Sequence, residues 1–204
     1  MIGAETRRVV VASSNHGKLA EIRSALDFEG WEFVTAADLG REPLEVEETG
    51  ETFEENARLK ARAYWQEFGC AALADDSGLE VDALDGAPGV FSSRYAGPDA
   101  TDADNNAKLL EALSGIPVAG RTARFRSTIV LVDVGGAETV ASGTCEGAIG
   151  LEARGAGGFG YDPLFLPEAT PGRTMAELAM AEKNAVSHRG SALRALRAAI
   201  EAGR

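Results

Sequence analysis

Carboxylate side chains are the strongest candidates for chemistry in this sequence. Asp75 and Asp76 stand side by side in LADDSG, just after an apolar run, and a glutamate-rich stretch contains Glu47 and Glu48. Two adjacent like charges at the end of a predicted strand repel each other, and a bound cation would relieve that repulsion. Because the chain has only two histidines and no CxxC spacing, its oxygen donors favour Mg²⁺ or Mn²⁺ over a softer metal. For the glutamates, a solvated acidic surface is the ordinary alternative.

A second candidate site is the turn ASSNHGKL, which joins a predicted strand to a predicted helix. Backbone amide groups at a helix N-terminus, together with Lys18, can bind an anion. The turn is not a Walker motif, because Ala12 replaces the first glycine and Leu19 replaces the Ser or Thr. A capped strand-to-helix turn without a ligand is the alternative. Lys60 is in phase with the apolar face of the helix predicted from 53 to about 68, so it is either a surface lysine or a functional one.

The segment GAGGFG matches the pattern G-x-G-x-x-G from Gly155 to Gly160. It does not predict a dinucleotide-binding fold, because residues 161–163 (Tyr-Asp-Pro) stand where a helix would have to begin. The composition favours a flexible loop that carries Phe159. The ring of Phe159 can lie against the ring of a ligand, or it can pack into the core.

Three further polar side chains lie close together in EKNAVSHRG, near the start of the last predicted helix. They are Lys183, His188 and Arg189. Each alone would be taken for surface charge. However, both histidines of the chain, His16 and His188, fall in segments that are already candidates for binding.

Apolar periodicity and capping signals predict the elements that position these residues. Helices are expected at 15–26, 52–68, 101–113, 174–184 and 186–200, and strands at 9–11, at 31–35 and, as a pair around Gly135-Gly136, between 121 and 150. The stretch 70–84 is expected to form a strand, a tight turn and a second strand. This order predicts an α/β fold, with a mixed sheet flanked by helices and no clear linker.

Composition limits the classes of protein to which the chain can belong. The 204 residues are 45% hydrophobic, enough for one α/β domain or two closely packed lobes. The net charge of −12 argues against broad binding to nucleic acid or to an anionic membrane. Cys70 and Cys145 do not suggest a disulfide scaffold, and no apolar run is long enough for a signal peptide or a membrane span. A cytoplasmic protein is therefore expected.

Taken together, the motifs resemble those of one protein family. Six segments carry the resemblance, in this order along nearly the whole chain: SSNHGK, EETGETFEENARLKA, LADDSGLEV, GAPGVFSSRYAG, GGFGYDPLF and AEKNAVSHRG. They are similar to segments of the inosine triphosphate pyrophosphatase (Ham1) family, and most of all to its bacterial XTP/dITP diphosphatases.

This resemblance implies a fold and an activity. The fold would be a mixed twisted sheet flanked by helices, in a single domain spanning residues 1–204 with two lobes around a central cleft. The protein would be a homodimer that hydrolyses non-standard purine nucleoside triphosphates (ITP, dITP and XTP) to the monophosphate and pyrophosphate. It would thereby remove them from the nucleotide pool before they enter DNA or RNA. Mg²⁺ would be the cofactor, with Mn²⁺ as a possible substitute.

The resemblance also implies roles for individual residues. Glu47 and Asp76 would bind the metal, and Asp76 would also be the catalytic proton acceptor. The residues that would contact the substrate are Ser13, Ser14, Asn15, His16, Gly17, Lys18, Lys60, Ser77, Phe159, Gly160, Tyr161, Asp162, Lys183, His188 and Arg189. The sequence departs from the family at Ser13-Ser14, where many members have Thr-Gly or similar small residues, and this affects the expected geometry of the turn.

The sequence also leaves two functions of other classes open. A nucleotide-binding sensor that has lost catalysis is disfavoured, because every matched catalytic position keeps a competent side chain. An oxidoreductase that uses a dinucleotide is suggested only by GAGGFG.

Overall fold

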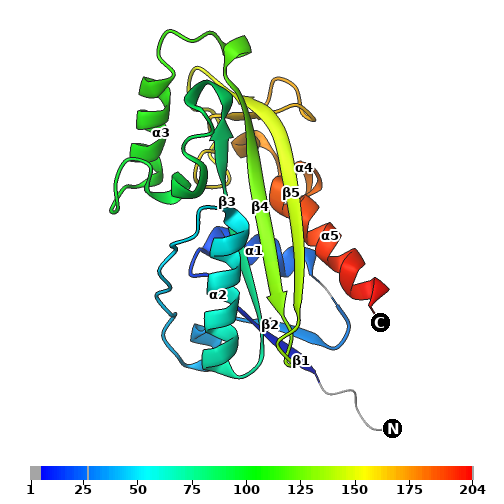
Figure 1. The fold of residues 1–204 in the computed structure, drawn as a ribbon. Helices are drawn as coiled ribbons and strands as arrows, with labels where there is room; N and C mark the ends of the chain where they lie inside the picture. The colour runs from blue at the N-terminus through cyan, green and yellow to red at the C-terminus, as the bar shows by residue number, and fades with distance from the viewer. Residues whose placement is uncertain (1–5, 27, 204) are drawn as a thin grey trace. The chain divides into compact units, whose positions relative to one another are not determined.

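The computed structural model describes residues 6–26 and 28–203, in which six strands form one mixed sheet with the order β2-β1-β3-β4-β5-β6 (Figure 1). The strands are β1 (Arg7–Val11), β2 (Trp31–Val34), β3 (Ala71–Val81), β4 (Thr122–Val132), β5 (Glu138–Ile149) and β6 (Phe165–Pro167). Strand β1 pairs in parallel with both β2 and β3, whereas β5 and β6 pair antiparallel. The predicted α/β class with a mixed sheet and flanking helices is confirmed.

The helices are α1 (His16–Ala25), α2 (Phe53–Phe68), α3 (Asp102–Ala112), α4 (Met180–Val186) and α5 (His188–Ala202), with 3₁₀ turns η1 (Ala37–Leu39), η2 (Asp82–Leu84), η3 (Gly89–Arg94), η4 (Val118–Gly120) and η5 (Met175–Glu177). The helices predicted to begin at Thr52 and Thr101 are confirmed, and each of these residues is the N-cap of a capping box. The single helix predicted over 174–184 is wrong. Leu178 and Ala179 are extended between η5 and α4, because the side chain of Leu178 is buried in the core. Among the described helices, none is long and apolar enough to cross a membrane.

The chain divides into two compact units. The first contains the residues up to Asp76 together with Thr128–Ser142 and the stretch from Ala192 onward, and the second contains Ser77–Ser127 and Gly143–Ser191. The boundary within β3 falls at the peptide bond between Asp76 and Ser77.

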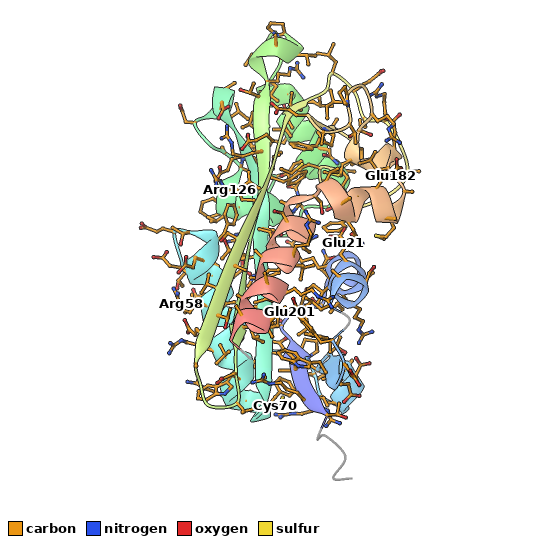
Figure 2. The ribbon with its side chains drawn as sticks, turned by 90° about the vertical axis from the view of Figure 1, so that its right-hand side faces the viewer. Glu21, Arg58, Cys70, Arg126, Glu182 and Glu201 are labelled. Atoms are coloured by element: carbon orange, nitrogen blue, oxygen red, sulfur yellow. The ribbon has the colours of Figure 1, made fainter. Side chains whose placement is uncertain are left out.

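The core of the first unit covers both faces of its strands. Val9 and Val11 of β1 pack in a cluster with α1 and with the part of α5 that begins at Ala192. Val10, whose side chain points to the other face, packs in a cluster with Ala57 and Ala61 of α2. Figure 2, in which Arg58 marks α2 and Glu201 marks α5, shows these two helices on either side of the strands. Three consecutive valines thus fill two cores at once, as expected for a fully buried strand.

The core of the second unit lies between its strands and α3. Leu109 and Leu113, at the end of α3, pack with Leu79 of β3, Ile149 of β5 and Phe165 of β6, and all five are fully buried.

The tight turn predicted within 70–84 is wrong, because β3 runs unbroken through Asp75, Asp76 and Ser77. Local propensity disfavours Asp and Ser in a strand. Here the chain is buried between β1 and β4, and the two carboxylates are satisfied by ion pairs with Lys18 and Lys60. Tertiary pairing therefore overrides the local turn signal, and the two aspartates lie within a strand.

Candidate functional site

The turn between β1 and α1 has the form expected of an anion-binding helix start. Asn15 is the N-cap residue, and its side-chain oxygen accepts a hydrogen bond of 3.0 Å from the backbone N–H of Lys18. The hydroxyl of Ser13 accepts a bond of 3.2 Å from the backbone N–H of Asn15. The amides in the first turn of a helix lack acceptors within the helix, so a turn held in this way can present them to an anion. Ser14 is exposed beside them, and the side chain of His16 lies outside the described part of the structure.

Two lysines and three carboxylates converge at the end of the first unit's segment of β3. Lys18 Nζ lies 2.9 Å from Asp75 Oδ2. Lys60 Nζ lies 2.6 Å from Asp76 Oδ1 and 2.8 Å from Glu48 Oε1. Both ammonium groups also donate to the backbone carbonyl of Asp75, at 3.3 and 3.4 Å. We call these five residues the carboxylate–lysine cluster.

Burial changes the acid–base properties of this cluster. Burial raises the pKa of Asp76, and the positive charges of Lys60 and Lys18 offset this only in part, so the carboxylate is a stronger base than an ordinary aspartate. Burial lowers the pKa of Lys60, but the adjacent charges of Asp76 and Glu48 outweigh it, so its pKa lies above the usual value. Lys60 therefore stays positively charged near neutral pH, beside a carboxylate suited to accept a proton.

A stripe on α2 holds the irregular segment that carries Glu48. Asn56, Lys60 and Tyr64 follow one another at intervals of four residues, so they share one face of the helix. The side-chain oxygen of Asn56 accepts from Gly50 N at 2.8 Å, and the hydroxyl of Tyr64 accepts from the backbone N–H of Leu44 at 3.1 Å. With the Lys60–Glu48 pair between them, these contacts fasten residues 44–50 along the helix, antiparallel to it.

Gly50 is required for this arrangement. A Cβ at residue 50 would lie 2.6 Å from Glu55 Cβ and 2.7 Å from the oxygen of Asn56, closer than real contacts of this kind. Sequence reasoning missed Asn56 and Tyr64. The signal that could have found them is their spacing of four residues on either side of Lys60.

Of the two adjacent glutamates, the structure brings Glu48 into the cluster, whereas the resemblance had assigned the metal to Glu47. Glu47 is exposed, whereas the side chain of Glu48 is 25% exposed and contacts Lys60. The residues of the cluster suit Mg²⁺, because two hard carboxylates, Glu48 and Asp76, approach a single cationic atom, Lys60 Nζ. Within residues 6–26 and 28–203, no group of three or more His, Cys, Asp or Glu side chains is arranged to hold a metal ion. Water and substrate oxygens would therefore have to complete the coordination, as is usual for Mg²⁺.

The second unit gathers most of the other predicted site residues around Phe159. Lys183 Nζ lies 2.7 Å from Asp162 Oδ2, and both side chains are buried. The same carboxylate oxygen accepts from the backbone N–H of Phe159 at 2.9 Å. The ring centroid of Phe159 lies 4.7 Å from Lys183 Nζ and 5.5 Å from Arg189 Cζ. Two cationic groups thus lie against an aromatic ring, which can in turn stack on a nucleobase.

Three other residues complete this group. Arg189 is 1% exposed and donates from Nη2 to the hydroxyl of Ser77 at 2.9 Å. The ring of His188 stacks on Phe125 with centroids 4.7 Å apart. Tyr161 is 4% exposed, and its hydroxyl donates to the backbone carbonyl of Ser92 at 2.8 Å. The side chain of Tyr161 therefore anchors the loop, and a substrate contact at this residue would have to come from its main chain.

Comparisons with known proteins agree with one another. A model of the Ham1 family matches residues 9–199. A protein of Exiguobacterium sibiricum named dITP/XTP pyrophosphatase is 51% identical over 193 residues, which cover 95% of this chain and 96% of that protein. A protein of Geobacter sulfurreducens with the same name is 53% identical over 190 residues, covering 93% and 94%.

Solved structures give the same result. The Ham1 protein of Staphylococcus aureus superposes with a TM-score of 0.85 at 38% identity, over 97% of this chain and all (100%) of that one. A HAM1 protein of Coxiella burnetii superposes with a TM-score of 0.84 at 46% identity, covering 96% and 98%.

Proposed function

From the premise that this chain belongs to the Ham1 family, we propose that it hydrolyses non-standard purine nucleoside triphosphates, among them dITP, XTP and ITP, to the monophosphate and pyrophosphate. The observation that carries the proposal is the carboxylate–lysine cluster beside the N-terminus of α1. A triphosphate needs cationic groups and backbone amides along its length, and its hydrolysis needs a base near the phosphorus that is attacked.

In this proposal the first unit binds the triphosphate. The amides at the start of α1 and the ammonium groups of Lys18 and Lys60 contact the phosphate oxygens. Glu48 and Asp76 would hold the Mg²⁺, which when bound would neutralise phosphate charge and lower the pKa of water. Mn²⁺ has similar ligand preferences and is proposed as a substitute.

Asp76 accepts the proton from the water that attacks the α-phosphorus. The water oxygen forms the new bond to phosphorus, the bond from the α-phosphorus to the bridging oxygen breaks, and its electron pair leaves with pyrophosphate. Lys18 and Lys60 stabilise the negative charge that builds up on this leaving group. The position of Asp76 within a buried strand and its ion pair with Lys60 support this role, because together they fix the carboxylate in one orientation.

In the second unit, we propose that Phe159 stacks on the base and that Lys183, His188 and Arg189 select it. All three side chains can donate hydrogen bonds, and a 6-oxo purine presents an acceptor where adenine presents an amino donor. Leaving one buried donor unpaired costs about 1–3 kcal/mol, or roughly tenfold to a hundredfold in rate. Guanine also carries a 6-oxo group, so its rejection has to come from the space near its 2-amino group. Ser77 is joined by a peptide bond to Asp76, so the chain itself connects the two groups of residues.

A homodimer and a single domain of two lobes remain predictions from the resemblance, and a cytoplasmic location remains a prediction from the composition.

The experiment that tests the proposal is a panel of initial rates for dITP, XTP, ITP, dATP and dGTP, with and without Mg²⁺, in which released pyrophosphate is measured. We expect rates for the 6-oxo substrates other than dGTP to exceed the rate for dATP by about two orders of magnitude or more, and to vanish when the metal is chelated. Equal rates for dITP and dATP would contradict the base assignment. Nucleotide binding without pyrophosphate release would instead indicate a sensor that does not catalyse.

A further inference from the structure

The loop that carries Phe159 has little rigidity of its own. Four of the six residues from Gly155 to Gly160 are glycines, and residues 151–158 are exposed. Glycine gives a loop more conformational freedom than any other residue, and ordering it costs more entropy. A stacking ring is useful only if it is held in one place. Contacts from outside the loop must therefore hold it.

Helix α3 holds the loop at Gly160. Asp102 Oδ2 accepts a hydrogen bond of 2.6 Å from Gly160 N, and Asn106 Nδ2 donates one of 2.9 Å to Gly160 O. The two side chains are one turn apart on the same face of α3, so together they bind both polar groups of a single residue. Gly160 has φ +59°, in the left-handed region, and a Cβ added there would have no heavy atom within 4 Å. We call this arrangement the Gly160 clamp.

The helix that carries the clamp is itself firmly held. The capping box of Thr101 and Asp104 closes its first turn. Between the two clamp residues, Asn105 is buried and bonds through its side chain to Ala96 N at 2.8 Å and to Ser93 O at 3.1 Å. These contacts fix α3, so the clamp fixes the loop to a rigid element.

The loop is anchored on its other side as well. Asp162 accepts from the backbone N–H of Phe159 and from Lys183, and Gly158 leaves room for that carboxylate, because a Cβ there would lie 2.0 Å from Asp162 Oδ2. Phe159 is thus held on both sides. Its own amide is bound by Asp162, which is paired with Lys183, and the next residue, Gly160, is bound by α3.

We propose that Asp102 and Asn106 are positioning residues, which hold the Phe159 ring where the purine stacks and so set KM and base selectivity without touching the nucleotide. The role of Phe159 in this inference rests on the proposed function. The clamp itself does not, because its hydrogen bonds are part of the structure. Asp102 and Asn106 lie 58 and 54 residues before Gly160, the residue that they hold.

The test uses Asp102→Ala and Asn106→Ala, with Asp102→Asn as the conservative variant, because an amide oxygen can still accept from Gly160 N. Glu111→Ala, an exposed position in the last turn of the same helix, is the matched control. Each alanine variant should raise KM for dITP about threefold to tenfold, change kcat less than about twofold, and reduce the dITP-to-dATP ratio of kcat/KM. Asp102→Asn should recover most of the loss, and Glu111→Ala should resemble the wild type.

Hydrogen exchange of the peptide covering 155–163 gives a second readout that needs no substrate. Exchange should be faster in both alanine variants, with the rest of the second unit unchanged and the thermal unfolding midpoint close to that of the wild type. Unchanged exchange in both variants would overturn the clamp. Faster exchange with an unchanged KM and selectivity would overturn its role in positioning the base. If the wild type does not hydrolyse dITP, the proposed function and the positioning role both fail, while exchange still decides whether the clamp exists.

Discussion

Replacing Glu48 with glutamine should raise the Mg²⁺ concentration needed for half-maximal activity by about tenfold to a hundredfold. The substitution keeps the shape of the side chain but removes its charge. The carboxylate lies 2.8 Å from Lys60 Nζ, and the two side chains are 25% and 13% exposed, so solvent screens this interaction only in part. A hydrogen bond between charged groups at such a site contributes about 1.5–3 kcal/mol, and a neutral amide is also a poorer ligand for a hard cation. Each 1.4 kcal/mol corresponds to a factor of about ten.

Glu47→Gln is the matched control, because it removes the same charge from the adjacent residue. Glu47 is exposed, and substitutions at such positions change free energies by about 0.5 kcal/mol or less, a factor of about two. The assay measures initial rates of dITP hydrolysis at a series of Mg²⁺ concentrations for the wild type and both variants. Binding of Mn²⁺, followed by electron paramagnetic resonance without nucleotide, provides a readout other than turnover.

Two results would exclude Glu48 as the preferred metal ligand: Glu47→Gln is the damaging change, or the two variants have the same metal dependence. The first result would restore the assignment that the resemblance suggests. The second would show that the contact of Glu48 with Lys60 does not distinguish the two glutamates in binding the metal.

Other substitutions and reagents test the remaining parts of the account. Asp76→Asn should lower turnover by about two to four orders of magnitude, as expected for a lost general base. Nucleotide binding, measured by calorimetry, should survive. Near-normal turnover would exclude Asp76 as the base. Arg189→Ala should reduce kcat/KM about tenfold to a hundredfold for dITP and much less for dATP, whereas an equal loss would assign Arg189 to phosphate or to structure. Burial raises the pKa of Cys145 to about 11, so at pH 8 only about one thiol in a thousand is ionised. Alkylation of native Cys145 should therefore be slow at pH 8, slower than that of the less buried Cys70, and should accelerate as the pH rises toward 11; equal labelling of both thiols at pH 8 would contradict this.

Local signals in the sequence were sufficient to predict where a helix begins when a side chain accepts a hydrogen bond from the backbone of a near neighbour. Asn15, Thr52 and Thr101 each cap a helix through a contact three residues away, and all three helices begin within one residue of the predicted position. The turn predicted in β3 failed for the opposite reason. Asp75 and Asp76 favour a turn locally, but Lys18 and Lys60, 57 and 16 residues distant, stabilise them inside a strand.

Among the site residues, too, some can be identified from the sequence, and others depend on contacts between distant parts of the chain. The types and order of Lys18, Lys60 and Asp76 carry the resemblance, and the structure brings the three side chains into one cluster. The contact of Glu48, rather than Glu47, with Lys60 could not be predicted from the sequence, because both glutamates lie in a segment without regular structure and no periodicity relates either one to α2. It depends on three contacts from the helix, and only the folded chain reveals them.

The Gly160 clamp could not be predicted for a further reason. Asp102 and Asn106 have the composition of an ordinary polar helix face, and their partner is a main-chain group without a side chain. No pattern of residue types identifies a glycine whose amide and carbonyl are both bound from a distant helix.

An oxygen-labelling measurement can decide whether the protein directs water to the α-phosphorus of a purine nucleoside triphosphate. The protein would be incubated with dITP and Mg²⁺ in ¹⁸O-enriched water, and the products would be resolved by mass spectrometry. We expect deoxyinosine monophosphate and pyrophosphate in equal amounts, with one ¹⁸O atom in the monophosphate and none in the pyrophosphate. Label in the pyrophosphate, or release of orthophosphate with the diphosphate, would contradict it.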